Sequence, residues 1–467
     1  MSANGSGTAT IDLIPELRSD LIDWIVELVG GGEASVTPFG HYRPLWSVDV
    51  RQQDRTVELF VRGARDSGSV LASVYNLERE AAVIRSLTNI GVPTPAWVGY
   101  NPKEQLLVLQ RIPGRGDFHN IEDVAMRERV AQRFIQVLAD LHAREPAEFR
   151  LQDIMTVPSS PQEHALGELE IAEPLFDQPE LTPEPIVTFG RQWMRRNVPA
   201  SVDHTCFIQG DTGPGNFVFH DNDVWLVDLE ISHFGDPMED LAAICIRDMV
   251  TPFGDLRELF KQYDRLTPWR LDFGRLRYHR VSKCVRSLMA IISLNEHGHQ
   301  RGEVLTWWAY RALYVRGACQ ALAEAMGLEF DALRDPAESR PSPAWSALHD
   351  LLDSDLADLR EAHGVRADRW TAVLERDLQT AAVLRLANEY GPEFRAREKA
   401  QLESLLGQSV ATNEVGLREL DDAIRQQRLS CSEVDLLRFL TARADRQCAI
   451  VRPAMGPTAD GFFSPIQ

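Results

Sequence analysis

This sequence lacks the features that mark several classes of protein. Its 467 residues include only six cysteines, which lie far apart and form no C-x-x-C pair, so neither a zinc site nor a disulfide framework is expected. Nowhere do 18 apolar residues follow one another, and residues 1–8 show no basic region that leads into an apolar stretch. We therefore expect a cytoplasmic protein that does not enter a membrane.

Positive charge is also scarce. The chain has 49 Lys and Arg against 69 Asp and Glu, a formal charge of -20 at pH 7, which argues against a nucleic-acid partner or an anionic membrane surface. Hydrophobic residues make up 44% and charged residues 25%, as in ordinary globular proteins. At this length the chain can bury a large core without a metal or a disulfide. A small-molecule partner and a homo-oligomer both remain open.

The first hundred residues favour a small β-rich region. Apolar residues recur at helical spacing or alternate along short segments, and glycines or polar turns separate these segments. The elements expected are a helix over 11–29, a hairpin of strands 45–50 and 57–62, a helix over 78–88, and strands over 96–100 and 105–110.

After Pro113 the apolar spacing becomes helical, except in one strand-rich island over 206–229. A Pro- and Ser-containing stretch, 335–346, then precedes a last helical segment. The predicted fold class is α+β, a bilobal protein-kinase-like fold followed by an all-helical domain. The predicted parts are an N-terminal helix and tail (1–29), a β-rich lobe (30–112), a helical lobe that contains the island (113–334) and a helical accessory domain (347–467).

The island carries a set of polar residues whose spacing is informative. It reads Q-G-D-T-G-P-G-N over 209–216, followed by V-D-L-E over 227–230. Phosphoryl transfer needs a carboxylate that orients the attacking hydroxyl, and oxygen ligands that hold magnesium against a triphosphate. Asp211 and Asn216 lie on one loop at the offset of the kinase catalytic loop, and the following hairpin brings Asp228 beside them. Each of these residues alone would be an ordinary turn former.

This segment resembles the signature of the aminoglycoside phosphotransferase and choline kinase superfamily, H-G-D-x-x-x-x-N followed by D-x-D/E. The resemblance covers residues 30–326 and implies a kinase that uses ATP and Mg²⁺. It implies that Asp211 is the catalytic base and that Asn216 and Asp228 bind magnesium. It also implies that Glu230 is a second acidic group near the metal.

Five positions in the N-terminal half match positions that bind the nucleotide in the same family. The resemblance implies that Arg62 holds the α- and β-phosphates of ATP and that Glu80 pairs with it. Gly40 begins the stretch G-H-Y-R-P, which stands where a glycine-containing loop would cover the phosphates. Gln110 and Ile112 fall on the hinge, whose backbone would bind adenine. Taken singly, a residue such as Arg62 or Glu80 is more often a solvated surface charge.

One residue departs from the family pattern. Gln209 stands where the family usually has a His that supports the catalytic loop. A nucleotide-binding pseudokinase, or a scaffold built around the helical tail, would keep the same lobes. Such a protein would not need Asp211, Asn216 and Asp228 together, so we expect a small-molecule kinase.

A cluster of basic residues over 265–286, which we call the basic island, is informative about the identity of the acceptor. It faces a single acid, Asp272, and would attract a phosphate-bearing acceptor such as a coenzyme A thioester while repelling a cationic aminoglycoside. A solvated helix face or a contact with a partner is the alternative interpretation. The island consists of Arg265, Arg270, Arg275, Arg277, Arg280, Lys283 and Arg286, of which Arg270, Arg275, Arg277 and Arg280 are the predicted acceptor contacts.

Resemblance favours the same acceptor. Residues 193–199 and 235–242 are similar to the branch of the superfamily associated with acyl-CoA metabolism, whose kinases act on hydroxyacyl-CoA thioesters. The segment after Pro343 is similar to a small helical domain that accompanies such kinases as a separate chain. A hydroxyacyl-CoA thioester is therefore the expected acceptor, with an aminoglycoside or another small alcohol as the alternative.

Overall fold

The computed structural model describes most of the chain. The described residues are 16–39, 43–64, 74–176, 183–297, 304–334, 346–364 and 369–466. They form two compact units, one of residues 1–157 with 206–234, and one of residues 158–205 with 235–467. We call these the sheet unit and the helical unit.

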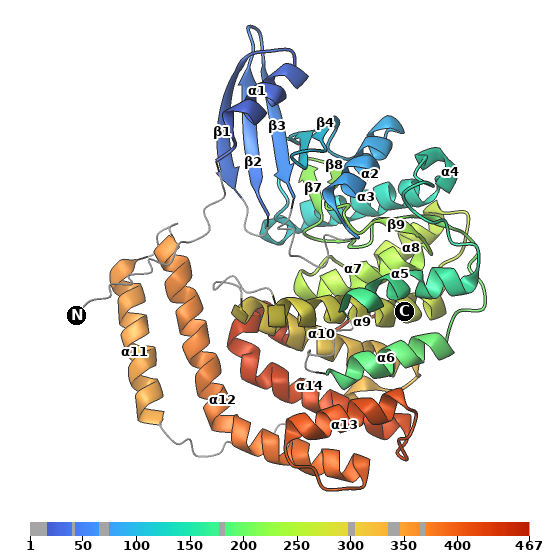
Figure 1. The fold of residues 1–467 in the computed structure, drawn as a ribbon, viewed down its shortest axis with the longest axis vertical. Helices are drawn as coiled ribbons and strands as arrows, with labels where there is room; N and C mark the ends of the chain where they lie inside the picture. The colour runs from blue at the N-terminus through green and yellow to red at the C-terminus, as the bar shows by residue number, and fades with distance from the viewer. Residues whose placement is uncertain are drawn as a thin grey trace. The chain divides into compact units, whose positions relative to one another are not determined.

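A five-stranded antiparallel sheet begins the sheet unit (Figure 1). Its strands, in spatial order, are β1 (Glu33–Phe39), β2 (Leu45–Arg51), β3 (Thr56–Gly63), β5 (Leu106–Gln110) and β4 (Trp97–Asn101). Alternating side chains of β2 and β3 are buried, because successive residues of a strand point to opposite faces. The buried face, with Trp46, Val48 and Val61, packs against Ile25 of helix α1 (Ser19–Leu28).

Helix α2 (Leu77–Asn89) packs against strands β4 and β5. Its N-cap is Asn76, whose side chain accepts a hydrogen bond from the backbone N–H of Arg79 at 2.9 Å. Glu80, one turn into the helix, is only 1% exposed. A carboxylate is seldom buried without a partner, so this position calls for a nearby cation.

The strand-rich island follows three further elements of the sheet unit, η2 (Phe118–Asn120), α3 (Val124–His142) and α4 (Pro146–Phe149). Strands β7 (Phe217–His220) and β8 (Asp223–Leu226) form an antiparallel hairpin. Phe217 of this hairpin packs on Phe134 of α3, with 4.8 Å between ring centroids. Strands β6 (Cys206–Ile208) and β9 (His233–Gly235) form a second small sheet. The residues predicted to be catalytic or to bind magnesium thus lie between β6 and β7 and just after β8.

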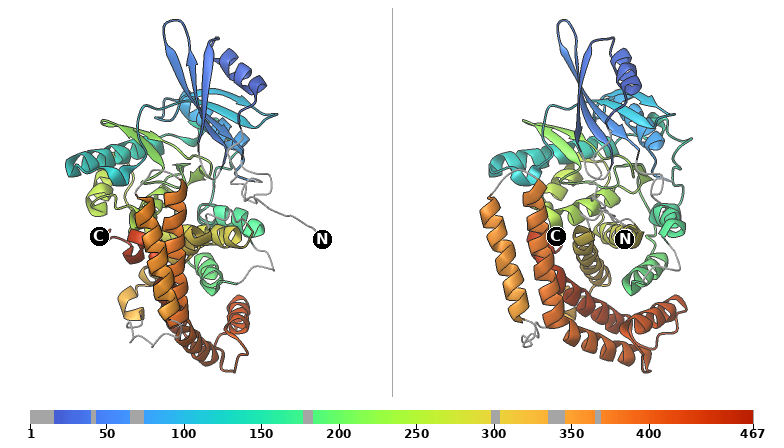
Figure 2. Two further views of the ribbon diagram at one scale, coloured as in Figure 1. Left: turned by 90° about the vertical axis from the view of Figure 1, so that its left-hand side faces the viewer. Right: turned by 60° about the vertical axis from the view of Figure 1, so that its left-hand side comes forward.

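The helical unit contains long helices that pack mainly on one another. Helix α10 packs against α9 and α14, and its Ala312 and Leu313 share a buried apolar cluster with Cys448 and Val451 of α14. Helix α11 lies beside α12, as both views of Figure 2 show. The elements are α5 (Pro161–Phe176), α6 (Pro185–Arg196), α7 (Met238–Val250), α8 (Leu256–Leu266), α9 (Phe273–His297), α10 (Val304–Ala325), η3 (Phe330–Leu333), α11 (Ser346–His363), α12 (Arg369–Leu406), α13 (Asn413–Arg425), α14 (Glu433–Met455) and η4 (Gly456–Asp460).

The predicted α+β class is confirmed, with an antiparallel sheet in the N-terminal part and helices in most of the remainder. The predicted hairpins and the helix over 78–88 are present within one or two residues. The predicted helix over 11–29 begins only at Ser19, because Arg18 has an extended backbone; residues 11–15 lie outside the described part. No described helix is both long and apolar enough to cross a membrane.

The predicted domain bounds stay a prediction. The stretch chosen as the boundary, 335–346, lies outside the described residues except for Ser346, which begins α11. The last helices belong to the same compact unit as residues 235–334. A tail that shares an apolar cluster with α10 is bound more firmly than an appendage on a linker would be.

Candidate active site

The loop that follows β6 brings Asp211 and Asn216 together. The side-chain Nδ2 of Asn216 donates hydrogen bonds to the backbone oxygen and to Oδ2 of Asp211, at 2.6 and 2.8 Å. Gly210 precedes them with a φ of +90°, and a Cβ there would lie 2.8 Å from the backbone oxygen of Ile231. Only glycine fits this position without strain. The loop therefore holds the Asp211 carboxylate in a fixed orientation.

Gln209 joins this loop to the strand that leads to Asp228. Its fully buried side chain donates from Nε2 to the backbone oxygens of Asn216 and Val227, at 3.0 and 2.8 Å. The backbone N–H of Val227 also donates to the oxygen of Asn216 at 3.2 Å. A neutral imidazole has one N–H donor, whereas the amide group has two. Gln209 thus connects the loop to the strand that precedes Asp228 through two side-chain hydrogen bonds.

Asp228 has an unusual backbone conformation. Its φ is +57°, in the left-handed region that residues other than glycine seldom adopt. The side chain is 39% exposed, and its Oδ1 lies 3.3 Å from Nη2 of Arg62. Strain of this kind concentrates at functional sites. The prediction that Asp228 stands beside Asn216 agrees with the backbone hydrogen bond between Val227 and Asn216.

Arg62 and Glu80 form a buried ion pair. Nη1 of Arg62, on β3, lies 2.5 Å from Oε1 of Glu80, on α2. Nη2 of the same guanidinium lies 3.3 Å from Oε2 of Glu230 as well as from Asp228. Arg62 therefore links three of the predicted acidic residues.

Arg43 is a member of this cluster that sequence reasoning did not single out. Its guanidinium pairs with Glu230 and lies 3.4 Å from Glu80, and its side chain is 8% exposed. The signal was available, because Arg43 belongs to the G-H-Y-R-P stretch and precedes Leu45, the residue opposite Arg62 in the β2–β3 register. Gly40, at the start of that stretch, lies outside the described residues.

Opposing effects set the pKa values of this cluster. Burial alone would lower the pKa of Arg62, but the negative charges of Glu80, Asp228 and Glu230 raise this pKa above its ordinary value. Burial raises the pKa of Glu80, and the charge of Glu230 adds to this, whereas Arg62 and Arg43 act against it. Arg62 thus stays charged, and the cluster keeps an excess of acidic groups.

The donor set near Asp228 suits magnesium. Asn216 and Asp228 offer oxygen atoms, and Mg²⁺ is usually held by one or two carboxylates together with substrate phosphates. Because Asn216 donates from Nδ2 to Asp211, its Oδ1 is the atom left for a metal. No group of three or more His, Cys, Asp or Glu arranged for a metal occurs among the described residues.

The predicted hinge residues lie at the end of strand β5 and just after it. Gln110 is the last residue of β5, is exposed, and donates its backbone N–H to the oxygen of Ala96 at 2.8 Å. Ile112 is half-buried just beyond the strand. Their adenine-binding role stays a prediction.

The basic residues of α9 do not form one surface. Arg275 is 4% exposed and lies 3.1 Å from Asp236, and Arg280 is 2% exposed and paired with Glu324. Arg277 is half-buried, whereas Arg270, before the helix, is 88% exposed and lies 3.2 Å from Asp264. The packing of α9 against neighbouring helices explains this difference in exposure. Charge in the sequence alone does not reveal which face of a helix is covered.

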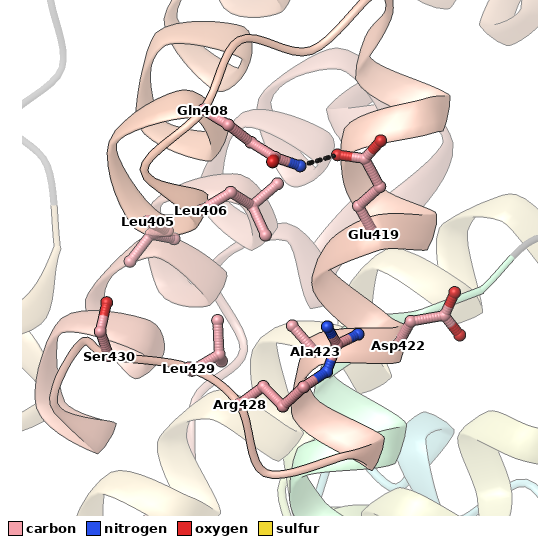
Figure 3. Close-up of a pocket in the computed structure, with 9 residues that line it drawn as sticks. All are labelled: Leu405, Leu406, Gln408, Glu419, Asp422, Ala423, Arg428, Leu429 and Ser430. Carbon is pink, nitrogen blue, oxygen red and sulfur yellow. Dashed lines mark hydrogen bonds between the residues drawn. The ribbon is translucent and has the colours of Figure 1, made fainter.

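A pocket of about 310 Å³ lies in the tail, between the end of α12, α13 and the segment 428–430 (Figure 3). Gln408 donates to Glu419 at 2.9 Å across its upper part. Its lining contains none of the predicted catalytic residues.

Comparison with known proteins finds distant relatives of about half of this chain. Rat acyl-CoA dehydrogenase family member 11 is 24% identical over 255 residues, 51% of this chain and 32% of that protein. The human protein of the same name is 22% identical over 233 residues, 45% of this chain and 28% of that protein. This chain thus spans about a third of the length of the curated relatives it matches.

A solved structure has the same fold. It is a protein of Ralstonia eutropha JMP134, described as a candidate aminoglycoside phosphotransferase, with 19% identity and a TM-score of 0.51. The match covers 67% of this chain and 97% of that one. The sequence pattern of the phosphotransferase enzyme family matches residues 47–279, which include Arg62, Glu80, Asp211, Asn216 and Asp228. Over those residues this chain belongs to the phosphotransferase enzyme family, whose members are enzymes that act on hydroxyl groups of small molecules.

Proposed function

We propose that this protein is an ATP- and Mg²⁺-dependent kinase that transfers the γ-phosphate to a hydroxyl group of a small molecule. The observation that carries the proposal is the pair of hydrogen bonds from Asn216 to Asp211, with Asp228 held just beyond Val227. A carboxylate fixed beside a second, partly exposed carboxylate suits the two roles of base and metal ligand. The reaction would take place in the cytoplasm.

Each residue of the cluster has a distinct role in this proposal. Asp211 accepts the proton of the acceptor hydroxyl, and Asn216 keeps its carboxylate in place. Arg62, held by Glu80, would bind the α- and β-phosphates, and Asp228 would serve as a metal ligand. Bound ATP and Mg²⁺ would supply the phosphoryl group and neutralise its charge.

A hydroxyacyl-CoA thioester is the acceptor that we propose. The names of the curated relatives point to acyl-CoA metabolism, and residues 235–242 resemble the corresponding branch of the superfamily. The basic island adds less than its sequence suggests, because Arg275 and Arg280 are engaged in internal ion pairs. Arg270 and Arg277 stay candidates for acceptor contacts. An aminoglycoside is the second candidate, since the solved structure with the same fold is described in those terms.

A screen of ATP consumption by the purified full chain tests this proposal. The acceptors are hydroxyacyl-CoA thioesters, aminoglycosides and amino alcohols, and the product is identified by its added phosphate mass. We expect turnover with a hydroxyacyl-CoA thioester that depends on Mg²⁺. Turnover with aminoglycosides alone would contradict the acceptor, and nucleotide binding without turnover on any acceptor would favour a pseudokinase.

A further inference from the structure

A second, larger pocket lies wholly within the helical unit. It has a volume of about 870 Å³ and is lined by residues of α10, α12 and α14 and by residues near η3 and η4. Small-molecule sites commonly occupy roughly 300–1,000 Å³. None of the predicted catalytic residues lines it, because all of them belong to the sheet unit. The lining of this pocket therefore shares no residue with the set proposed to hold the nucleotide.

The described lining of the pocket is rich in arginine. It contains five arginines against the four carboxylates of Asp331, Glu393, Asp445 and Asp460, in a chain whose formal charge is -20. The arginines are Arg316, Arg334, Arg397, Arg446 and Arg452. A local excess of positive charge in an acidic protein attracts anions to that place.

Arg316 carries a buried charge that forms no salt bridge with a carboxylate of the described residues; Asp460, on the same lining, interacts with it at longer range. Its side chain is 3% exposed, and its guanidinium donates to the backbone oxygens of Thr458, Ala459 and Gly461 at 2.7–3.1 Å. Its Nε makes no hydrogen bond within the described part of the chain. Carbonyl oxygens solvate a guanidinium but do not neutralise it, and buried charges are normally paired. This arginine is the strongest indication that the pocket receives an anion.

Flat side chains line the same pocket. Tyr390 and Phe394, one turn apart on α12, are stacked with 5.6 Å between ring centroids, and both are half-buried. Phe462 has the guanidinium of Arg316 4.4 Å from its ring centre and that of Arg334 4.9 Å away. Aromatic faces and guanidinium planes both stack on flat ring systems. The lining thus suits a ring as well as an anionic group.

We propose that this pocket binds an organic anion in which a phosphate or carboxylate group is joined to an aromatic ring system. The anionic group lies against Arg316 and the neighbouring arginines, and the ring lies against the aromatic side chains. The guanidinium fork accepts phosphate and carboxylate alike, so the charge and the ring define the ligand class. The proposal does not depend on the kinase activity, because no residue of the sheet unit takes part.

Titration calorimetry of the full chain tests the proposal with 2-naphthyl phosphate, 2-naphthoate, 2-naphthol and inorganic phosphate as probes. No nucleotide is added, because a nucleotide is itself an aromatic phosphate and would compete for the pocket; the variants described below assign the binding to this pocket. We expect at least one naphthyl anion to bind more tightly than naphthol and inorganic phosphate. Comparison of the two naphthyl anions shows whether phosphate or carboxylate is preferred. Absence of binding by both anions, or equally tight binding of naphthol, would overturn the proposal.

Variants locate the binding. Arg316→Gln should weaken the binding of the preferred anion by about tenfold or more, which is the usual effect of losing a charge-assisted hydrogen bond. Should Arg316→Gln fail to fold, Arg452→Gln and Tyr390→Ala test the same pocket, since the Arg452 side chain is 56% exposed and Tyr390 is half-buried. Arg428→Gln, in the smaller pocket of Figure 3, is the matched control and should bind like the native chain. Binding that no variant of the larger pocket weakens would refute the assignment.

Discussion

Arginines meet buried carboxylates in both units, and the two clusters differ in how their charges balance. In the sheet unit, two arginines, Arg43 and Arg62, face three carboxylates, and one of these, Asp228, is 39% exposed. The other two carboxylates are Glu80 and Glu230. We call this set the open cluster, because a carboxylate remains accessible to a ligand.

The cluster of the helical unit is closed. Glu184 is fully buried, its Oε2 lies 3.0 Å from Nη2 of Arg311, and its Oε1 pairs with Arg443 of the tail. Neither arginine side chain is more than 9% exposed. An excess of acid with an exposed member suits the binding of a cation and its phosphates, whereas a sealed set holds helices together. Burial of an ion pair alone therefore does not mark an active site.

The largest effect is expected from opening the closed cluster. Glu184→Gln leaves two buried guanidinium groups without their shared carboxylate, so the free energy of unfolding should fall by about 3–5 kcal/mol. Urea unfolding measures this change, and turnover per folded molecule should stay the same. Glu433→Gln is the matched control, because its pair with Arg196 is 43–49% exposed and should contribute less than about 1 kcal/mol.

The pH dependence sharpens this prediction. Burial would raise the pKa of Glu184, but the charges of Arg443 and Arg311 hold it below its ordinary 4.5. A lowered pKa in the folded state contributes stability that is present above the unfolded pKa and is lost as pH falls through the folded pKa. The difference between the native chain and Glu184→Gln should therefore shrink below about pH 4.5. A difference that grows on acidification would contradict the ion-pair interpretation.

A substitution in the open cluster should change activity and leave stability nearly unchanged, the reverse of what we expect for Glu184→Gln. Asp228→Asn removes a proposed metal ligand but keeps a residue that tolerates the left-handed backbone at φ +57°. We expect activation by Mg²⁺ to weaken by at least about tenfold, the lower end of the effects seen around metal ligands. The free energy of unfolding should change by less than about 1 kcal/mol, because Arg62 keeps Glu80 and Glu230. Unchanged Mg²⁺ activation would remove Asp228 from the site.

The smallest effect on turnover is expected from substitutions of Gln209. In Gln209→His the ring can donate only one of the two hydrogen bonds to Asn216 and Val227, so we expect turnover to fall by less than about tenfold. Gln209→Leu loses both hydrogen bonds, so its turnover should be lower than that of Gln209→His. Equal rates for Leu and His at this position would show that these hydrogen bonds do not orient the loop.

Local patterns in the sequence were enough to predict the hairpins and the proximity of Asp211 and Asn216. Period-two alternation predicts the strands now seen at 45–51 and 56–63, and the short spacing from Asp211 to Asn216 leaves little freedom for their relative placement. Strand register explains what was missed, since Arg43 comes near Arg62 only because Leu45 pairs with Arg62.

Tertiary burial could not be predicted in the same way. The arginines at 275 and 280 looked like an exposed basic face, but neighbouring helices and acids from distant segments enclose them. Glu184 precedes α6 and gave no sequence signal, because its partners lie 127 and 259 residues away. Long-range charge pairing follows from the packing of helices, which apolar spacing alone does not define.

The most direct test of the account is the rate of phosphoryl transfer by Asp211→Asn. The substitution keeps the size of the side chain but removes the proposed base, so turnover with the best acceptor of the screen should fall by at least about a hundredfold. Calorimetry should show that MgATP still binds, since Arg62, Glu80 and Asp228 are untouched. Turnover close to that of the native chain would contradict the assignment of Asp211 as the catalytic base.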